Sequence, residues 1–221
     1  MDVKALDVKA LDVKKLEKTI DDADTLRAHY GPPLEVAIAL NKTRLDKYHR
    51  AFIALSPFVC ISASDASGQP SISPKGDAPG FVQVLDDNTL MIPDRPGNQQ
   101  ITTFSAIVEN PKVGLLFLVP GRKETLRIEG QATITLDDDV LAAGAVRGKL
   151  PPAALVITVT AARIHCGKCV VRSNLWDPAI QIDKDAIPSY GQIIKDQAGD
   201  LHLTADTADE LVERVYREEL Y

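Results

Sequence analysis

The sequence predicts a mostly β fold with flanking helices, an α+β protein built on a small barrel or sandwich. Five segments between residues 58 and 164 are rich in β-branched and aliphatic residues and are bounded by Gly, Pro, Asn or Asp. One clear helix, at about residues 98 to 109, falls among them and is ended by Asn110-Pro111. Short turns join the strands, which disfavours alternating βαβ units.

The composition is that of an ordinary globular protein of 221 residues, 45% apolar and 25% charged. The formal net charge of −6 argues against a general nucleic-acid binder, which needs a basic face. The first residues alternate charges without an apolar signal-peptide core, and no apolar run is long enough to span a bilayer. Three cysteines do not make a disulfide framework. We therefore expect a soluble, cytoplasmic protein without nucleic-acid or membrane partners.

The chain begins with a near-perfect five-residue repeat, DVKAL DVKAL DVKKL. Four of its apolar residues fall at helical spacings of three and four and form one stripe: Val3, Leu6, Ala10 and Val13. Two interpretations stay open, a helix that binds a partner and a helix that packs on its own domain or frays. Because Gly31-Pro32-Pro33 stops the helix, residues 1–33 are expected to be an N-terminal helical extension.

The barrel domain is expected over residues 34–187, with a helical segment at 188–221 packed on it. The domain begins with an amphipathic segment at about residues 34 to 50, whose apolar residues recur at intervals of three and four: Leu45, Tyr48 and Phe52. The C-terminal segment places four apolar residues on one helical face: Leu211, Val212, Val215 and Tyr216.

The strands are predicted at 58–65, 89–93, 112–119, 124–136 and 154–164. Two polar stretches, Asp65-Ala66-Ser67-Gly68 and Leu85-Asp86-Asp87-Asn88, are typical of hairpin turns.

A polar stretch rich in glycine and proline, SISPKGDAPG at residues 71–80, is either a surface hairpin or an anion site. The second interpretation gains support from LMIPDRPGNQQ at 90–100, where Asn98 is a candidate N-cap for the helix that follows. Arg95, just before it, could offer a planar donor fork to a phosphate. If strands near 71–75 and 89–92 are neighbours, Lys75 and Ser73 converge on the same point. The sequence therefore predicts a phosphate site here.

Residues 50 to 135 resemble the FMN-binding split-barrel family related to pyridoxamine phosphate oxidase. The resemblance is carried by SPKGD, IPDRPGN, NPKVGLLF and LRIEG in this order, and further on by CGKCVVRSNLWDP. It implies a six-stranded Greek-key split β-barrel that forms a homodimer, with FMN in clefts at the interface. It is specific to the family and not to one reaction.

The resemblance also implies which residues hold the cofactor. Ser73, Lys75 and Gly76 match the first phosphate-binding loop. The second loop is matched by Pro93, Asp94, Arg95 and Asn98. Thr125 matches a position that faces the isoalloxazine ring, and Arg172 and Trp176 are expected near the partner's flavin.

Two departures from the family pattern qualify these expectations. Family members commonly carry Arg or Lys where this chain has Gln99 and Gln100, and a neutral donor binds phosphate less strongly than a charged one. We therefore expect weaker flavin retention than in a typical member. The arginine- and histidine-bearing C-terminal motif by which the true oxidase grips its pyridoxal substrate is missing, which puts vitamin B6 oxidation in doubt.

Other catalytic patterns are weak. Cys166 and Cys169 have the Cys-x-x-Cys spacing of a zinc half-site or redox pair, but no second ligand pair and no βαβ unit accompany them, so two incidental thiols at a turn are favoured. The four histidines lie far apart, without a nucleophile elbow, so the catalytic residues are left unknown.

The leading hypothesis is an FMN-binding homodimer that acts as a flavin-dependent oxidoreductase on a small molecule, with no metal. The alternative is a non-catalytic module for flavin binding, storage or redox sensing. A haem or deazaflavin binder is a third possibility, with His165 and the nearby thiols as the plausible haem ligands.

Overall fold

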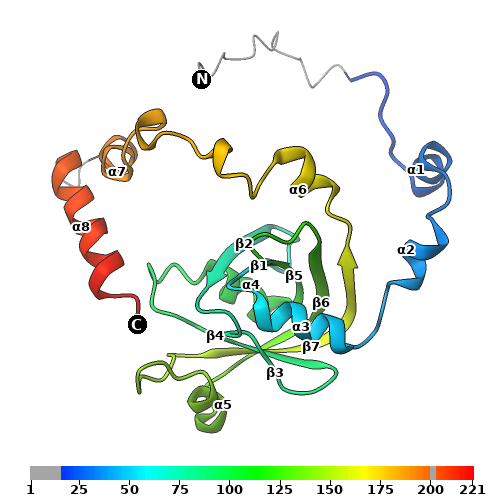
Figure 1. Cartoon of the computed structure of the whole chain (residues 1–221), viewed down its shortest axis with the longest axis horizontal. Coiled ribbons are helices and arrows are strands. Elements are labelled where there is room, and N and C mark those ends of the chain that lie inside the picture. Colours follow the sequence, from blue (N-terminus) through cyan, green and yellow to red (C-terminus); the bar gives the residue numbers. More distant parts are fainter. Residues whose placement is uncertain (1–15, 200–202) are drawn as a thin grey trace. The chain divides into compact units, whose positions relative to one another are not determined.

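The computed structural model describes residues 16–199 and 203–221 (Figure 1). The chain divides after Ala39 into two compact units. The first unit contains α1 (Ala23–Tyr30) and α2 (Glu35–Ala39), neither of which buries a residue. The helix α1 ends at Gly31, whose φ of 70° is readily adopted only by a residue without a side chain, so the predicted stop is confirmed. The predicted apolar stripe of the repeat, Val3 to Val13, lies outside the described residues.

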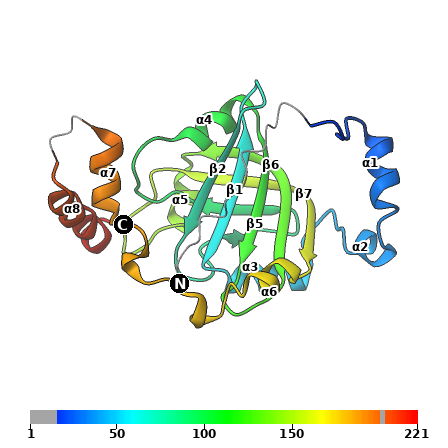
Figure 2. The ribbon, with the colours of Figure 1, turned by 90° about the horizontal axis from the view of Figure 1, so that it is seen from above.

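The second unit, Leu40–Tyr221, is built on one antiparallel sheet of seven strands with flanking helices, which confirms the mixed α+β class. The strand order is β2-β1-β5-β6-β7-β4-β3, and Figure 2 shows β2, β1, β5 and β6 side by side. The strands are β1 (Phe58–Ser64), β2 (Pro70–Gly76), β3 (Gln83–Val84), β4 (Thr89–Pro93), β5 (Lys112–Leu118), β6 (Thr125–Thr135) and β7 (Ala154–His165). The sheet thus has seven strands, not the expected six.

The pairing of β2 differs from the sequence expectation. The predicted turn at Asp65–Gly68 joins β1 to β2, which pair from Ser64 opposite Pro70 to Phe58 opposite Gly76. The strand β4 pairs instead with β3 and β7. The prediction that the strands near 71–75 and 89–92 are neighbours in the sheet is therefore wrong, because β2 lies at the edge of the sheet and pairs only with β1 among the described strands.

The α-helices of the second unit are α3 (Lys47–Leu55), α4 (Thr102–Glu109), α5 (Asp138–Ala143), α6 (Lys168–Ser173), α7 (Tyr190–Ala198) and α8 (Ala205–Glu218), and two short 3-10 helices span Pro178–Ile180 and Lys184–Ala186. The amphipathic segment predicted at 34 to 50 is not one helix. Lys42 bridges to Ala162 of β7 in extended conformation, and the Asp46 carboxylate accepts from the amides of Tyr48 and His49, which starts α3 at Lys47.

The predicted C-terminal helical segment is likewise two helices. The Thr204 hydroxyl accepts from the Thr207 amide and starts α8 separately. The helices α7 and α8 approach closely at Gly191, where a Cβ would lie 2.3 Å from the Ala205 carbonyl oxygen. The predicted single apolar face is only half covered, since Val212 and Val215 are half-buried whereas Leu211 and Tyr216 are exposed.

The core lies inside the curved sheet and is built from alternate residues of its strands. The burial alternates along β5 and β6, so that one face of each is apolar and buried. The buried strand residues include Val59, Ile61, Leu115, Phe117, Leu126 and Ile128, with Ile53 of α3 and Ile107 of α4 in the same cluster. Within the described part of the chain, no helix combines the length and apolar character needed to cross a membrane.

Candidate functional site

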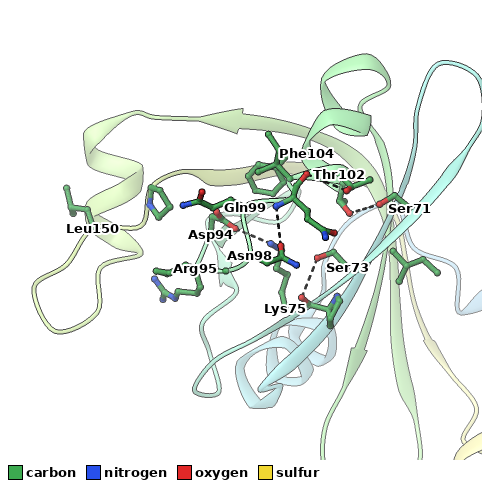
Figure 3. A pocket seen from close by; sticks show the side chains of 18 residues that line it. Ser71, Ser73, Lys75, Asp94, Arg95, Asn98, Gln99, Thr102, Phe104 and Leu150 are labelled. Atoms are coloured by element: carbon green, nitrogen blue, oxygen red, sulfur yellow. Dashed lines mark hydrogen bonds and ion pairs between the residues drawn. The ribbon is translucent and has the colours of Figure 1, made fainter. Parts of the chain in front are cut away.

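A cleft of about 830 Å³ lies between β2 and the segment that connects β4 to α4 (Figure 3). One side comes from β2, where Ser71, Ser73 and Lys75 alternate with exposed residues and so share the inner face of the strand. The other side comes from residues 94 to 104. Two residues from a distant part of the chain, Leu150 and Pro152, complete the lining.

Two ion pairs cross the gap between β2 and the end of β4. Lys75 Nζ lies 3.0 Å from Asp94 Oδ1, and Arg95 Nε lies 2.7 Å from Asp77 Oδ2. The two strands are not hydrogen-bonded to each other, so these side chains meet because the sheet curls. The predicted convergence of Lys75 with the 94–98 segment is thus found, although by a different route from the strand pairing expected.

The Arg95 guanidinium is already bound by other protein groups and is not fully free to bind a phosphate. Its Nε donates to Asp77 and its Nη1 donates to the Gly144 carbonyl oxygen at 2.8 Å, which leaves Nη2 without a partner among the described residues. The Asp77 carboxylate is only 4% exposed. Burial by itself would raise the pKa of Asp77, but hydrogen bonds from Tyr221 and Ala78 and the Arg95 guanidinium outweigh it, and the pKa lies below its ordinary value. Asp77 is therefore a carboxylate anion at neutral pH.

The turn before α4 has unusual backbone geometry. Asn98 was predicted to cap a helix beginning near it, but α4 begins at Thr102, after Ile101, and has no side-chain cap. The Asn98 side chain instead accepts from the Gln100 amide at 3.2 Å. Gln99 and Ile101 have φ of 59° and 43°, a left-handed conformation that is a genuine outlier for a β-branched residue.

The first residues of α4 lie at the cleft. The amides of Thr102, Thr103 and Phe104 have no acceptor among the described residues. All three residues line the cleft, and the Thr103 hydroxyl is 2.7 Å from that of Ser71 on the opposite side. The cleft therefore combines hydroxyls, an ammonium group and free amides, the donors that bind phosphate groups.

The predicted site residues divide into three groups. Ser73, Lys75, Asp94, Arg95 and Asn98 line the cleft. Gly76 and Pro93 neighbour it in sequence but do not line it: Gly76 is the last residue of β2, just beyond Lys75, and Pro93 is buried opposite Ala154. The third group, described next, lies elsewhere.

Thr125, Arg172 and Trp176 gather around the start of β6 and do not line the cleft. Thr125 is buried and pairs with His165 of β7. Arg172 lines a smaller hollow of about 410 Å³ with Lys123 and Glu124, and Trp176 Nε1 donates to the Arg122 carbonyl oxygen at 2.6 Å.

Ser71 belongs to the stretch 71–80 that is predicted as an anion site, and its alternation with Ser73 and Lys75 places it on the same face of β2. Several other cleft residues were missed by the sequence reasoning. Thr102, Thr103 and Phe104 were missed because the start of the helix was placed too early. Nothing in the local sequence around Leu150 and Pro152 points to this site.

The cysteines make no metal site. Cys166 and Cys169 are exposed free thiols, and Cys166 Sγ is 3.8 Å from His165 Nδ1. Across residues 16–199 and 203–221, no group of three His, Cys, Asp or Glu side chains is placed to hold a metal ion.

Comparison with known families identifies one match. The family model of pyridoxamine 5'-phosphate oxidase matches residues 45–166, more than half of the chain. This range includes all the residues that line the cleft, whereas Tyr221, which contacts Asp77 and Arg95, lies outside it. No curated protein matches the chain.

Three of the solved structures that are similar to this chain share less than 25% of its residues. HupZ from Group A Streptococcus is 23% identical, with 53% of this chain and 91% of that chain covered and a TM-score of 0.44. An FMN-binding protein from Syntrophomonas wolfei is 11% identical, with coverage of 64% and 95% and a TM-score of 0.40. HutZ, the heme storage protein from Vibrio cholerae, is 16% identical, with coverage of 56% and 90% and a TM-score of 0.38.

Proposed function

The chain belongs to the pyridoxamine 5'-phosphate oxidase family, and from this premise we propose that it binds FMN in the cleft between β2 and α4. We further propose that it acts as a flavin-dependent oxidoreductase on a small molecule. FMN, when bound, supplies hydride or electron transfer, and the protein supplies binding and orientation.

The observation that carries the proposal is the meeting of two sets of phosphate donors. Ser71, Ser73 and Lys75 face the cleft from β2, and the uncapped first turn of α4 faces it from the other side. An anion at this point would accept from amides that have no other described partner and would lie at the positive end of the helix dipole.

The rest of the cleft fits a flavin in size and polarity. A volume of about 830 Å³ lies in the range of small-molecule pockets, and the lining includes apolar groups suited to an aromatic ring system. These groups are Ile101, Phe104, Leu150 and Pro152.

The charge balance of the cleft favours a second candidate, a non-catalytic module that binds flavin and releases it. Lys75 and Arg95 are each paired with a carboxylate, so these four side chains carry no net charge. Gln99 and Gln100 add donors without charge. A phosphate would therefore be held less firmly than by unpaired cations, which suits a flavin carrier as well as a weakly loaded enzyme.

The proposed cofactor site is completed by a second copy of the chain. Arg172 and Trp176 lie outside the cleft of their own chain, so a role at the flavin requires that they reach the cleft of a partner. A homodimer with FMN at the interface would provide this arrangement. Light scattering coupled to gel filtration tests it, and a monomer at the concentrations used for flavin binding would remove Arg172 and Trp176 from the site.

The first experiment is the visible spectrum of the purified protein, before and after adding FMN and desalting. One retained FMN per chain supports the cofactor assignment, and reduction of that FMN by pyridine nucleotides or another donor separates an enzyme from a carrier. A colourless protein that does not retain added FMN contradicts the proposal. A sharp Soret band would indicate that the bound cofactor is haem and not FMN.

A further inference from the structure

Tyr221 contacts three parts of the second unit that are far apart in sequence. Its hydroxyl donates to Asp77 Oδ1 at 2.7 Å, and Lys149 Nζ donates to its backbone oxygen at 2.8 Å. The guanidinium carbons of Arg147 and Arg95 lie 5.1 Å and 5.7 Å from the centre of its ring. Tyr221 is thus fixed by contacts at its hydroxyl, its ring and its backbone.

The hydroxyl of Tyr221 completes the donor set around Asp77. Asp77 Oδ1 accepts from this hydroxyl and from the Ala78 amide at 2.7 Å, and Oδ2 accepts from Arg95 Nε. A carboxylate with donors on both oxygens cannot rotate without breaking one of them. Tyr221 is therefore one of three donors that together fix the orientation of Asp77.

Asp77 in turn sets the orientation of Arg95. Two of the three guanidinium nitrogens are engaged, by Asp77 and by the Gly144 carbonyl oxygen, and the residue lines the cleft. A planar guanidinium held at two nitrogens presents its remaining donors in one direction and loses little further freedom when a ligand binds.

We propose that Tyr221 is a positioning residue for the anion end of the cleft. By fixing Asp77 it holds Arg95 so that the Nη2 group is available to the phosphate of a bound ligand. Tyr221 does not line the cleft, so its effect passes through Asp77 and Arg95. The inference rests on the proposed function, because it assigns Tyr221 a part in recognising the FMN phosphate.

The test compares FMN with riboflavin, the same ring system without a phosphate. Binding of each is measured by flavin fluorescence in the full chain, in Tyr221→Phe and in Tyr216→Phe, a matched control at an exposed position of α8. In Tyr221→Phe we expect the dissociation constant for FMN to rise roughly five- to tenfold, less than the loss of a charged group's own hydrogen bond to the phosphate would cause, because Tyr221 acts only through Asp77 and Arg95. Riboflavin affinity should be unchanged, and Tyr216→Phe should match the wild type for both ligands.

A purely structural role would weaken FMN and riboflavin equally, and that result would overturn the inference. So would an unchanged FMN affinity in Tyr221→Phe when the wild type prefers FMN to riboflavin, an outcome that leaves the proposed function standing. A wild-type chain that binds neither flavin, or both equally, contradicts the phosphate site itself and the inference with it.

A second variant shows whether Tyr221 acts through Asp77. Asp77→Asn removes both the anchor of Arg95 and the negative charge beside it, so the ratio of FMN to riboflavin affinity should change. Adding Tyr221→Phe should change this ratio little further, because both changes disturb the same link. Full additivity of the two effects would contradict the proposed route. If Tyr221→Phe lowers the melting temperature strongly, an unchanged ratio of FMN to riboflavin affinity in Asp77→Asn overturns the inference.

Discussion

Lys75 and Asp94 form an ion pair, with 3.0 Å between Nζ and Oδ1, across a gap that no backbone hydrogen bond closes. Lys75 is near the end of β2, an edge strand of the sheet, and Asp94 directly follows β4. The second pair, Arg95 with Asp77, crosses the same gap, so side chains connect the ends of β2 and β4, which are not paired in the sheet. These two pairs place charged groups beside the cleft. The Arg95–Asp77 pair is more buried than the Lys75–Asp94 pair, so its loss should cost more stability.

The variant Lys75→Ala should weaken FMN binding without unfolding the protein. Both side chains of its ion pair are about one-fifth exposed, and such pairs contribute about 1 kcal/mol or less to the free energy of unfolding. Loss of one charge-assisted hydrogen bond to the phosphate should raise the dissociation constant for FMN roughly tenfold. Fluorescence titration measures it, with Lys112→Ala at an exposed position of β5 as the control. Wild-type FMN affinity in Lys75→Ala would remove Lys75 from the proposed site.

The variant Arg95→Ala should lose stability as well as flavin affinity. It leaves the carboxylate of Asp77, which is 4% exposed, without its ionic partner and frees the Gly144 carbonyl oxygen. We expect the free energy of unfolding to fall by about 2 kcal/mol or more, measured by urea denaturation. Arg50→Ala breaks a more exposed ion pair with Asp87 and should cost well under about 1 kcal/mol. Equal losses in the two variants would show that the buried Arg95–Asp77 pair contributes no more to the free energy of unfolding than the exposed Arg50–Asp87 pair does.

The variant Gly130→Ala should destabilise the sheet. Gly130 stands at the irregularity between β6 and β7, where a Cβ would lie 2.5 Å from the Thr158 carbonyl oxygen and 2.9 Å from Ile157 Cγ2. Backbone must shift to relieve such contacts, so we expect a loss of about 1–3 kcal/mol in urea unfolding. Gly97→Ala is the matched control, since the nearest atom to its Cβ would be 4.0 Å away. A Gly130→Ala protein as stable as the control would contradict the tight packing between these strands.

The stability of the protein should fall at acidic pH in part through Asp77. Its pKa is lowered in the folded state, so its contribution is fully present above its ordinary pKa of 3.8 and is lost as the pH falls below that value toward the folded pKa. The free energy of unfolding measured between pH 6 and pH 3 should therefore decline below about pH 4. The decline should be shallower in Asp77→Asn, which cannot titrate at this position. An identical decline in both proteins would mean that other carboxylates account for it.

The local features of the fold followed from the sequence because they depend on near neighbours. The predicted strand at 89–93 coincides with β4, and those at 58–65 and 112–119 differ from β1 and β5 by one residue. Alternation of apolar side chains and turn residues such as Asp65–Gly68 are short-range signals. The start of α4 was misplaced because Asn98 has the chemistry of an N-cap, whereas the backbone turns left-handed at Gln99 and Ile101 before the helix begins.

The sequence by itself determined the class of fold, most of its strands and, through its resemblance to a family, the two segments that form the cleft. Only the tertiary structure decided that β2 pairs with β1, that Lys75 meets Asp94, and that Asp77, Arg95 and Tyr221 are linked. Asp77 and Tyr221 are 144 positions apart, and no local periodicity encodes such a contact. It arises because the curl of the sheet and the packing of later segments bring these side chains together, and both depend on the whole chain.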